Sequence, residues 1–369
     1  MKSNNSFYQN ISSLLATNQP FVLFRLPGRQ SQLWVQNTLP LQTSTNPEKL
    51  LSSTGFLFAP FISSIKVPAI LLRPDSIYHE GEPLPITANF PMNKEPISTE
   101  DEKKIESNKD TYLNNLGHLI NILKDGEVEK VVISRSTKVE RLTNDLLMKV
   151  YTTLVFDYPQ AFVYLAHLPP YGTWMGATPE TLISCQGSHC HTMALAGTRV
   201  FGSPEKWGTK ETEEQAIVSR YILEIVQKHQ VQNLQVSEPF TSTTGNLEHL
   251  CTRFEFQLPE PDALRLLIND LHPTPAVCGF PLEDALKLID RFEAHHREYY
   301  TGYLGPVHFD DQTHLFVNLR CMKITPSRMV LYTGGGITRD SVAENEWHET
   351  SAKAHSMLSV IEKFRNLAV

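Results

Sequence analysis

Two pairs of glutamates lie far apart in this chain of 369 residues: Glu211 and Glu214, and Glu346 and Glu349. Both surrounding stretches are typical of helices, on which residues three apart share one face. If the two faces converge, four carboxylates occupy a small volume, which is repulsive unless a cation lies between them. Carboxylate oxygens without nearby histidine–cysteine clusters suit Mg²⁺, so we expect a magnesium site. The alternative is two solvated acidic faces, which is the commoner arrangement.

Two further residues have the right chemistry for an acid–base pair. Lys130 opens the strand-like run Lys-Val-Val-Ile-Ser-Arg. Burial in a closed pocket would disfavour its ammonium form and make it a candidate base, whereas a strand-end lysine is more often exposed. Glu180 follows a proline that marks a kink or strand edge, where a carboxyl can enter a cavity as a general acid. An exposed turn carboxylate is the alternative for Glu180.

Several groups could bind a carboxylate ligand. The triple glycine 334–336 allows close backbone approach, so its amides could hold an anion. Arg320 is a possible bidentate clamp, and His249 could donate a hydrogen bond. Lys353 lies one turn after Glu349, and an ordinary i,i+4 ion pair is its alternative interpretation. Together with a metal site, these groups suit a small dianionic substrate.

Composition excludes several classes of protein. A net charge of −7 and a pI near 6.1 give no basic field for nucleic acid. No apolar run reaches membrane-spanning length, and the first residues lack the apolar core of a signal peptide. The cysteines are odd in number and scattered, which fits a reducing cytoplasm better than a disulfide framework. They are Cys185, Cys190, Cys251, Cys278 and Cys321.

The cysteines and histidines at 185–191 do not form a convincing zinc site. Gln-Gly-Ser (186–188) is typical of a hairpin turn, and strand alternation then separates Cys190 from His191. No second ligand pair has a zinc-like spacing, so no zinc is predicted.

The order of predicted elements indicates an α+β domain, with runs of antiparallel strands interrupted by helices. Residues 1–105 are rich in Pro, Ser, Thr and Asn, and a polar connection follows at 93–109. Periodicity predicts helices and strands in the remainder. The helices are 110–123, 210–229, 260–271, 282–297 and 342–366; the strands are 21–26, 55–61, 130–139, 161–167, 173–185, 191–200, 314–324 and 328–334.

Six motifs, in order from Lys130 to the C-terminus, resemble those of the chorismate-utilising enzymes, which include isochorismate, salicylate, anthranilate and aminodeoxychorismate synthases. They are Lys-Val-Val-Ile-Ser-Arg, Ala-Thr-Pro-Glu, Leu-Ala-Gly-Thr-Arg, His-Pro-Thr-Pro-Ala-Val, Tyr-Thr-Gly with Asn-Leu-Arg, and Gly-Gly-Gly-Ile with Glu-Trp-His-Glu-Thr-Ser-Ala-Lys. The resemblance implies a single α+β domain with large antiparallel sheets flanked by helices. Residues 106–369 would form the catalytic region, and the variable residues 1–105 would pack on the same core.

The resemblance also implies roles for individual residues. Lys130 would activate water at C2 of chorismate, and Glu180 would protonate the departing C4 hydroxyl. Mg²⁺ would be bound directly by Glu214 and Glu349, and through water by Glu211 and Glu346. The residues expected to contact the substrate are Leu195, Thr198, His249, Ala276, Tyr300, Arg320, Gly334, Gly335 and Lys353.

Two positions separate the members of the family. Ala196 stands where aminodeoxychorismate synthases usually carry a lysine, and Ala276 where lyases that expel pyruvate tend to carry threonine. The resemblance therefore implies an isomerase that makes isochorismate for menaquinone or catechol siderophores, acting as a monomer without a glutaminase subunit. A salicylate synthase, an anthranilate-type synthase and an inactive chorismate-binding protein are the alternatives. One departure is Gln215, where the family commonly has histidine.

Overall fold

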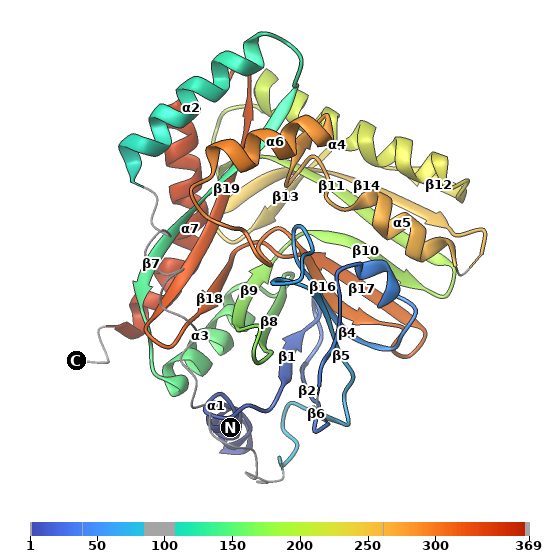
Figure 1. Cartoon of the computed structure of the whole chain (residues 1–369), viewed down its shortest axis with the longest axis vertical. Helices are drawn as coiled ribbons and strands as arrows, with labels where there is room; N and C mark the ends of the chain where they lie inside the picture. The colour runs from blue at the N-terminus through green and yellow to red at the C-terminus, as the bar shows by residue number, and fades with distance from the viewer. Residues whose placement is uncertain (1, 39, 85–107, 261, 366–369) are drawn as a thin grey trace.

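Two large antiparallel sheets form the body of the molecule (Figure 1). The computed structural model describes residues 2–38, 40–84, 108–260 and 262–365. Within these ranges one sheet has nine strands and the other has ten, and helices lie against both. This arrangement confirms the predicted α+β class. The predicted polar connection at 93–109 falls almost wholly outside the described residues.

The two sheets draw their strands from distant parts of the chain. The nine-stranded sheet has the order β15 (Gly279–Phe280), β7 (Lys130–Glu140), β19 (Arg328–Thr338), β18 (Cys321–Ile324), β9 (Thr173–Thr178), β8 (Phe162–His167), β1 (Phe21–Arg25), β2 (Ser31–Val35) and β6 (Ser76–His79). The ten-stranded sheet has the order β12 (Gln232–Val236), β14 (Leu247–Gln257), β11 (His189–Val200), β10 (Thr181–Gln186), β17 (Gln312–Val317), β16 (Tyr303–Val307), β4 (Gly55–Ala59), β5 (Ala69–Leu72) and β3 (Gln42–Ser44), with β13 (Phe240–Thr244) also on β14. Strands from residues 21–79 thus join both sheets.

An aromatic core lies between the sheets. Phe162 of β8 stacks on Phe316 of β17 with ring centroids 4.3 Å apart, and Phe58 of β4 stacks on Tyr299 at 4.5 Å. All four side chains are buried. Each such ring contributes roughly 1.5–3 kcal/mol by leaving water, so this layer is a main source of cohesion between the sheets.

The helices cover the outer faces of the sheets. On the nine-stranded sheet lie α1 (Lys2–Leu14), α3 (Asn144–Asp157) and α7 (Ala343–Arg365). On the ten-stranded sheet lie α4 (Thr209–Lys228) and α5 (Ala263–Leu271), with the short η1 (Pro47–Lys49) beside α5. A separate cluster joins α2 (Lys109–Lys124) and α6 (Leu282–Phe292) to β7 (Figure 1). None of the helices described is both long and apolar enough to cross a membrane.

Two predicted strands are wrong, and both errors fall where the site forms. The predicted strand 173–185 is two strands, β9 and β10, which belong to different sheets and meet at Pro179. The predicted strand 314–324 likewise divides into β17 and β18, because Arg320 takes a left-handed backbone with φ of 46°. Proline cannot donate to a ladder, and a left-handed residue cannot continue one. The chain therefore crosses between sheets at both places.

Other predicted boundaries differ in smaller ways. The predicted helix 282–297 ends at Phe292, and β19 extends through the triple glycine to Thr338. The expectation that the cysteines form no disulfide is wrong for one pair, because Cys185 and Cys190 are bonded. They lie directly opposite each other across the β10–β11 hairpin, whose turn was predicted at 186–188. The other three cysteines are free and buried.

Candidate active site

A cavity opens where the chain passes between the two sheets. It holds about 680 Å³ of unfilled space, open solvent at its mouth included, which suits a small ligand. Its walls come from strands β7, β11, β14 and β19, from helices α4 and α7, and from the loop positions 179–180, 276–277, 300–301 and 319–320. The lining residues predicted from the sequence are Glu180, Leu195, Thr198, Glu214, His249, Ala276, Tyr300, Arg320, Gly334 and Lys353.

Of the two proposed acid–base residues, Glu180 lines this cavity, whereas Lys130 lies behind the lining residues Glu214 and Gly336. Lys130 is fully buried, and its Nζ lies 2.9 Å from Oε1 of Glu214. The direction of that contact is poor for a hydrogen bond, and the ammonium has no hydrogen-bond partner in the described structure. Glu180 is 3% exposed. Its burial raises its pKa to about 8, although Lys130 and Lys353 lower it, so this carboxyl is protonated at neutral pH.

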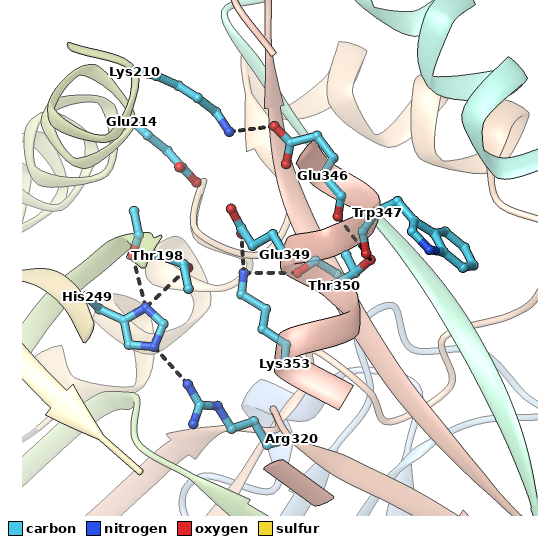
Figure 2. A network of polar contacts seen from close by, with 12 residues as sticks. Thr198, Lys210, Glu214, His249, Arg320, Glu346, Trp347, Glu349, Thr350 and Lys353 are labelled. Atoms are coloured by element: carbon cyan, nitrogen blue, oxygen red, sulfur yellow. Dashed lines mark hydrogen bonds and ion pairs between the residues drawn. The ribbon is translucent and has the colours of Figure 1, made fainter. Parts of the chain in front are cut away.

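Three of the four carboxylates expected to hold a metal are each paired with a lysine. Besides the contact of Glu214 with Lys130, Nζ of Lys210 lies 2.5 Å from Oε1 of Glu346 and Nζ of Lys353 lies 2.8 Å from Oε1 of Glu349 (Figure 2). Three lysine ammonium groups are thus each paired with one of three carboxylates from α4 and α7. Burial raises the pKa of Glu214, but Lys130 and then Lys210 outweigh it and hold that pKa below its usual value.

The fourth carboxylate has a local partner. Oε2 of Glu211 accepts a hydrogen bond from the backbone N–H of Gly208 at 3.1 Å, which caps the start of α4. The expectation that all four carboxylates share one small volume is therefore not met. Among the residues described, no three His, Cys, Asp or Glu side chains are grouped closely enough to hold a metal ion.

One observation nevertheless favours a cation at this place. Glu346 is fully buried, and its Oε2 has no hydrogen-bond partner. Burial and then repulsion by Glu349 raise the pKa of Glu346 to about 7, against the attraction of Lys210. The donors are all carboxylates on two facing helices, which is the chemistry that Mg²⁺ prefers. The donor set fits this ion, provided that the carboxylates draw together.

Helices α4 and α7, which carry the acidic pairs, approach β19 so closely at the triple glycine that side chains there would collide with them. A Cβ on Gly336 would overlap Oε1 of Glu214 and would lie 2.9 Å from Cε of Lys130. A Cβ on Gly335, on the opposite face, would lie 3.2 Å from Oε2 of Glu346. Any side chain at 336 would therefore displace the groups that the site needs. Gly334 and Gly336 line the cavity, whereas Gly335 does not.

Arg320 and His249 form a buried pair at the cavity wall. A guanidinium N–H of Arg320 donates to Nε2 of His249 at 2.8 Å, and Nδ1 of His249 donates to the carbonyl of Gly197 at 2.9 Å. Burial, Arg320 and Lys353 hold the pKa of His249 well below its usual value, so the ring is neutral. Both ring nitrogens have protein partners, which makes His249 a support for Arg320 as well as a wall residue. Burial lowers the pKa of Arg320 to about 10, so it stays charged.

Tyr300 lies on the same wall, stacked on Tyr332 with centroids 5.4 Å apart. Its buried hydroxyl would lie 3.0 Å from a Cβ on Gly334, so the phenol and this glycine are close neighbours. Ala196 and Ala276 present only methyl groups to the cavity. The sequence indicated no role for Tyr332 or Thr333, and for Gly336 it indicated only an anion-binding amide within the triple glycine; all three residues line the cavity.

Two further residues of α4, Lys210 and Gln215, make contacts that the sequence did not predict. Lys210 opens the motif Lys-Glu-Thr-Glu-Glu-Gln, in which a lysine beside three glutamates is itself a signal of an ion pair. Gln215 is buried, and its amide donates to the carbonyl of Ala194 at 3.1 Å and to Oγ1 of Thr252 at 3.1 Å. Gln215 stands where the family commonly has histidine. Its two hydrogen bonds hold α4 against β11 and β14 next to Glu214.

Comparison with known proteins identifies the family. Residues 84–362 match the family model described as chorismate binding enzyme, so the chain belongs to that family. It is 26% identical over 307 residues to the vibriobactin-specific isochorismate synthase of Vibrio cholerae, covering 80% of this chain and 76% of that one. It is 29% identical over 247 residues to isochorismate synthase EntC of Escherichia coli K12, covering 63% and 62%.

Solved structures support the same fold. A putative 2,3-dihydroxybenzoate-specific isochorismate synthase, DhbC from Bacillus anthracis, superposes with a TM-score of 0.76 at 22% identity over 95% of this chain and 99% of that one. MenF, the menaquinone-specific isochorismate synthase of Escherichia coli, gives 0.76 at 20% identity over 95% and 91%. At these identities the likeness concerns the fold alone.

Proposed function

We propose that this protein is an isochorismate synthase, which converts chorismate into isochorismate by adding water at C2 and losing the hydroxyl from C4. One observation carries the proposal: Glu180, a carboxyl whose pKa is raised by burial, lines the cavity, and the fully buried Lys130 lies directly behind it against the lining residue Glu214. Such a pair supplies a base and an acid to the same ring. Relatives with 26–29% identity that bear this name support the assignment.

In the proposed reaction, Lys130 removes a proton from a water molecule as its oxygen bonds to C2. The ring double bonds shift, and the C4–O bond breaks as Glu180 gives its proton to the departing hydroxyl, which leaves as water. One water enters and one leaves, so the overall change is an isomerisation. Lys130 must first leave its ion pair with Glu214, because only a neutral amine with a free lone pair can accept that proton.

The substrate carboxylates would be held by cationic groups on the cavity wall. Arg320 offers a planar fork that suits a carboxylate, and its bond to His249 fixes the orientation of that fork. Lys353 and Tyr300 would add single donors. A carboxylate between such groups leaves water without losing its electrostatic partners, which fixes the ring relative to Lys130 and Glu180.

Mg²⁺ is proposed as the cofactor, held by Glu214 and Glu349, with Glu211 and Glu346 further out. When bound, it would neutralise these carboxylates and anchor the ring carboxylate of the substrate. The unpartnered Oε2 of buried Glu346 supports a cation here. The relatives include both vibriobactin-specific and menaquinone-specific enzymes, so siderophore and menaquinone synthesis are the two pathways proposed.

The direct test is to incubate the purified chain with chorismate and Mg²⁺ in water enriched in ¹⁸O and to separate the products by chromatography. The proposal predicts isochorismate with one ¹⁸O at C2. Unlabelled isochorismate would contradict the attack by water, and anthranilate in the presence of ammonia would assign the chain to another branch of the family.

A further inference from the structure

Lys210 joins the two helices that carry the acidic pairs. It lies in the first turn of α4, and its ammonium reaches across to Oε1 of Glu346 on α7 at 2.5 Å (Figure 2). This ion pair links the helix that carries Glu211 and Glu214 to the helix that carries Glu346 and Glu349.

Lys210 is the counter-ion of the Glu346 carboxylate in the structure. The Glu346 side chain is fully buried, and its only ion pair among the residues described is with Lys210. A buried carboxylate without a counter-ion is costly, because the lost hydration is not replaced. Lys210 therefore occupies the electrostatic position that a bound cation would otherwise take.

The two groups differ in their freedom to move. The side chain of Glu346 has no exposed surface, whereas 22% of the Lys210 side chain is exposed. A lysine has a flexible stem and a strongly hydrated head, so it can leave towards solvent at small cost. An incoming divalent cation would be repelled by the ammonium and would compete with it for the same oxygens.

We propose that Lys210 is an internal counter-ion that occupies the metal position in the metal-free protein and is displaced when Mg²⁺ binds. This inference rests on the proposed magnesium cofactor. On this proposal Lys210 lowers the affinity of the site for Mg²⁺. While no metal is present, it keeps the buried carboxylate of Glu346 in an ion pair.

The test is isothermal titration of Mg²⁺ into the full-length protein and its variants, with no substrate present. Lys210→Met should bind Mg²⁺ about tenfold more tightly or better, which corresponds to at least ~1.4 kcal/mol. Its metal-free form should melt at a lower temperature, and excess Mg²⁺ should restore most of that loss. Lys210→Arg keeps the charge and should bind Mg²⁺ like the wild type.

A matched control lies at the other end of the same helix. Lys228 pairs with Asp270 on the surface, and its side chain is 65% exposed, so Lys228→Met should leave magnesium affinity unchanged. Equal or weaker binding of Mg²⁺ by Lys210→Met would overturn the role of Lys210 while leaving the magnesium site standing. No binding by the wild type, with full activity in chelator, would instead refute the magnesium site, and the role of Lys210 with it.

Discussion

Replacing Gly336 by alanine tests whether the positions of Lys130 and Glu214 control the reaction. The new Cβ would lie 2.9 Å from Cε of Lys130 and from Cδ of Glu214, and closer still to Oε1 of that glutamate. Ordinary contacts begin near 3.4 Å, so both groups must move by about 0.5 Å or more. Gly336 has no positive φ, and hence the effect comes from crowding alone.

The expected result is a large loss of rate with a small loss of stability. Overpacking of this kind costs ~1–3 kcal/mol, which lowers the melting temperature by several degrees in a chain of this size. A displacement of about 1 Å in a reacting group costs roughly 10²-fold in rate. Gly336→Ala should therefore lose about 10²-fold in kcat, measured with saturating chorismate and Mg²⁺.

Gly335→Ala is the matched control, because its Cβ would point to the other face of β19. There it would meet Oε2 of Glu346 at 3.2 Å and Cγ2 of Thr350 at 3.4 Å, which are milder contacts. We expect Gly335→Ala to keep most of its kcat. If Gly336→Ala kept a kcat within about twofold of the wild type while folding normally, the placement of the base and the metal ligand would be wrong.

Three further predictions concern the remaining groups. Since burial raises the pKa of Glu180 to about 8, its acid form persists below that pH and is lost above it. The kcat should therefore fall as the pH rises through about 8, and Glu180→Gln should lose 10²–10⁴-fold in kcat with that limb absent; an unchanged pH profile in Glu180→Gln would exclude it as the acid. Arg320→Ala should raise KM strongly and Arg320→Lys should rescue it only in part, because a point charge lacks the planar fork; a normal KM would place Arg320 outside substrate binding. Glu214→Gln and Glu349→Gln should abolish turnover without unfolding the protein, as followed by circular dichroism, and full activity of the wild type in excess chelator would contradict the magnesium requirement.

The sequence predicted which residues line the cavity better than how the charged groups around it are paired. Glu180 was expected to follow a proline that ends a strand. It does follow Pro179, at the point where the chain passes from one sheet to the other. The expectation followed from a local rule, that proline cannot donate to a ladder. That the same point joins two different sheets depends on pairings with β17 and β18, which are distant in sequence and have no local signal.

The arrangement of charges could not be predicted from spacing alone. The i,i+3 rule correctly places each acidic pair on one helix face, but it does not say what faces it. The lysines that pair with Glu214 and Glu346 come from β7 and from the opposite helix. Long-range contacts of this kind depend on the tertiary fold. The sequence therefore predicted a cluster of carboxylates, whereas the structure shows carboxylates in ion pairs with lysines.

We propose that the product is isochorismate and that its enolpyruvyl group stays attached. Ala276 lines the cavity and has no side-chain hydroxyl. The most direct measurement is pyruvate release from chorismate, coupled to lactate dehydrogenase, with and without added isochorismatase. We expect little pyruvate from the protein alone and a steady release once isochorismatase is added. Stoichiometric pyruvate from the protein alone would contradict it and would point to a salicylate synthase.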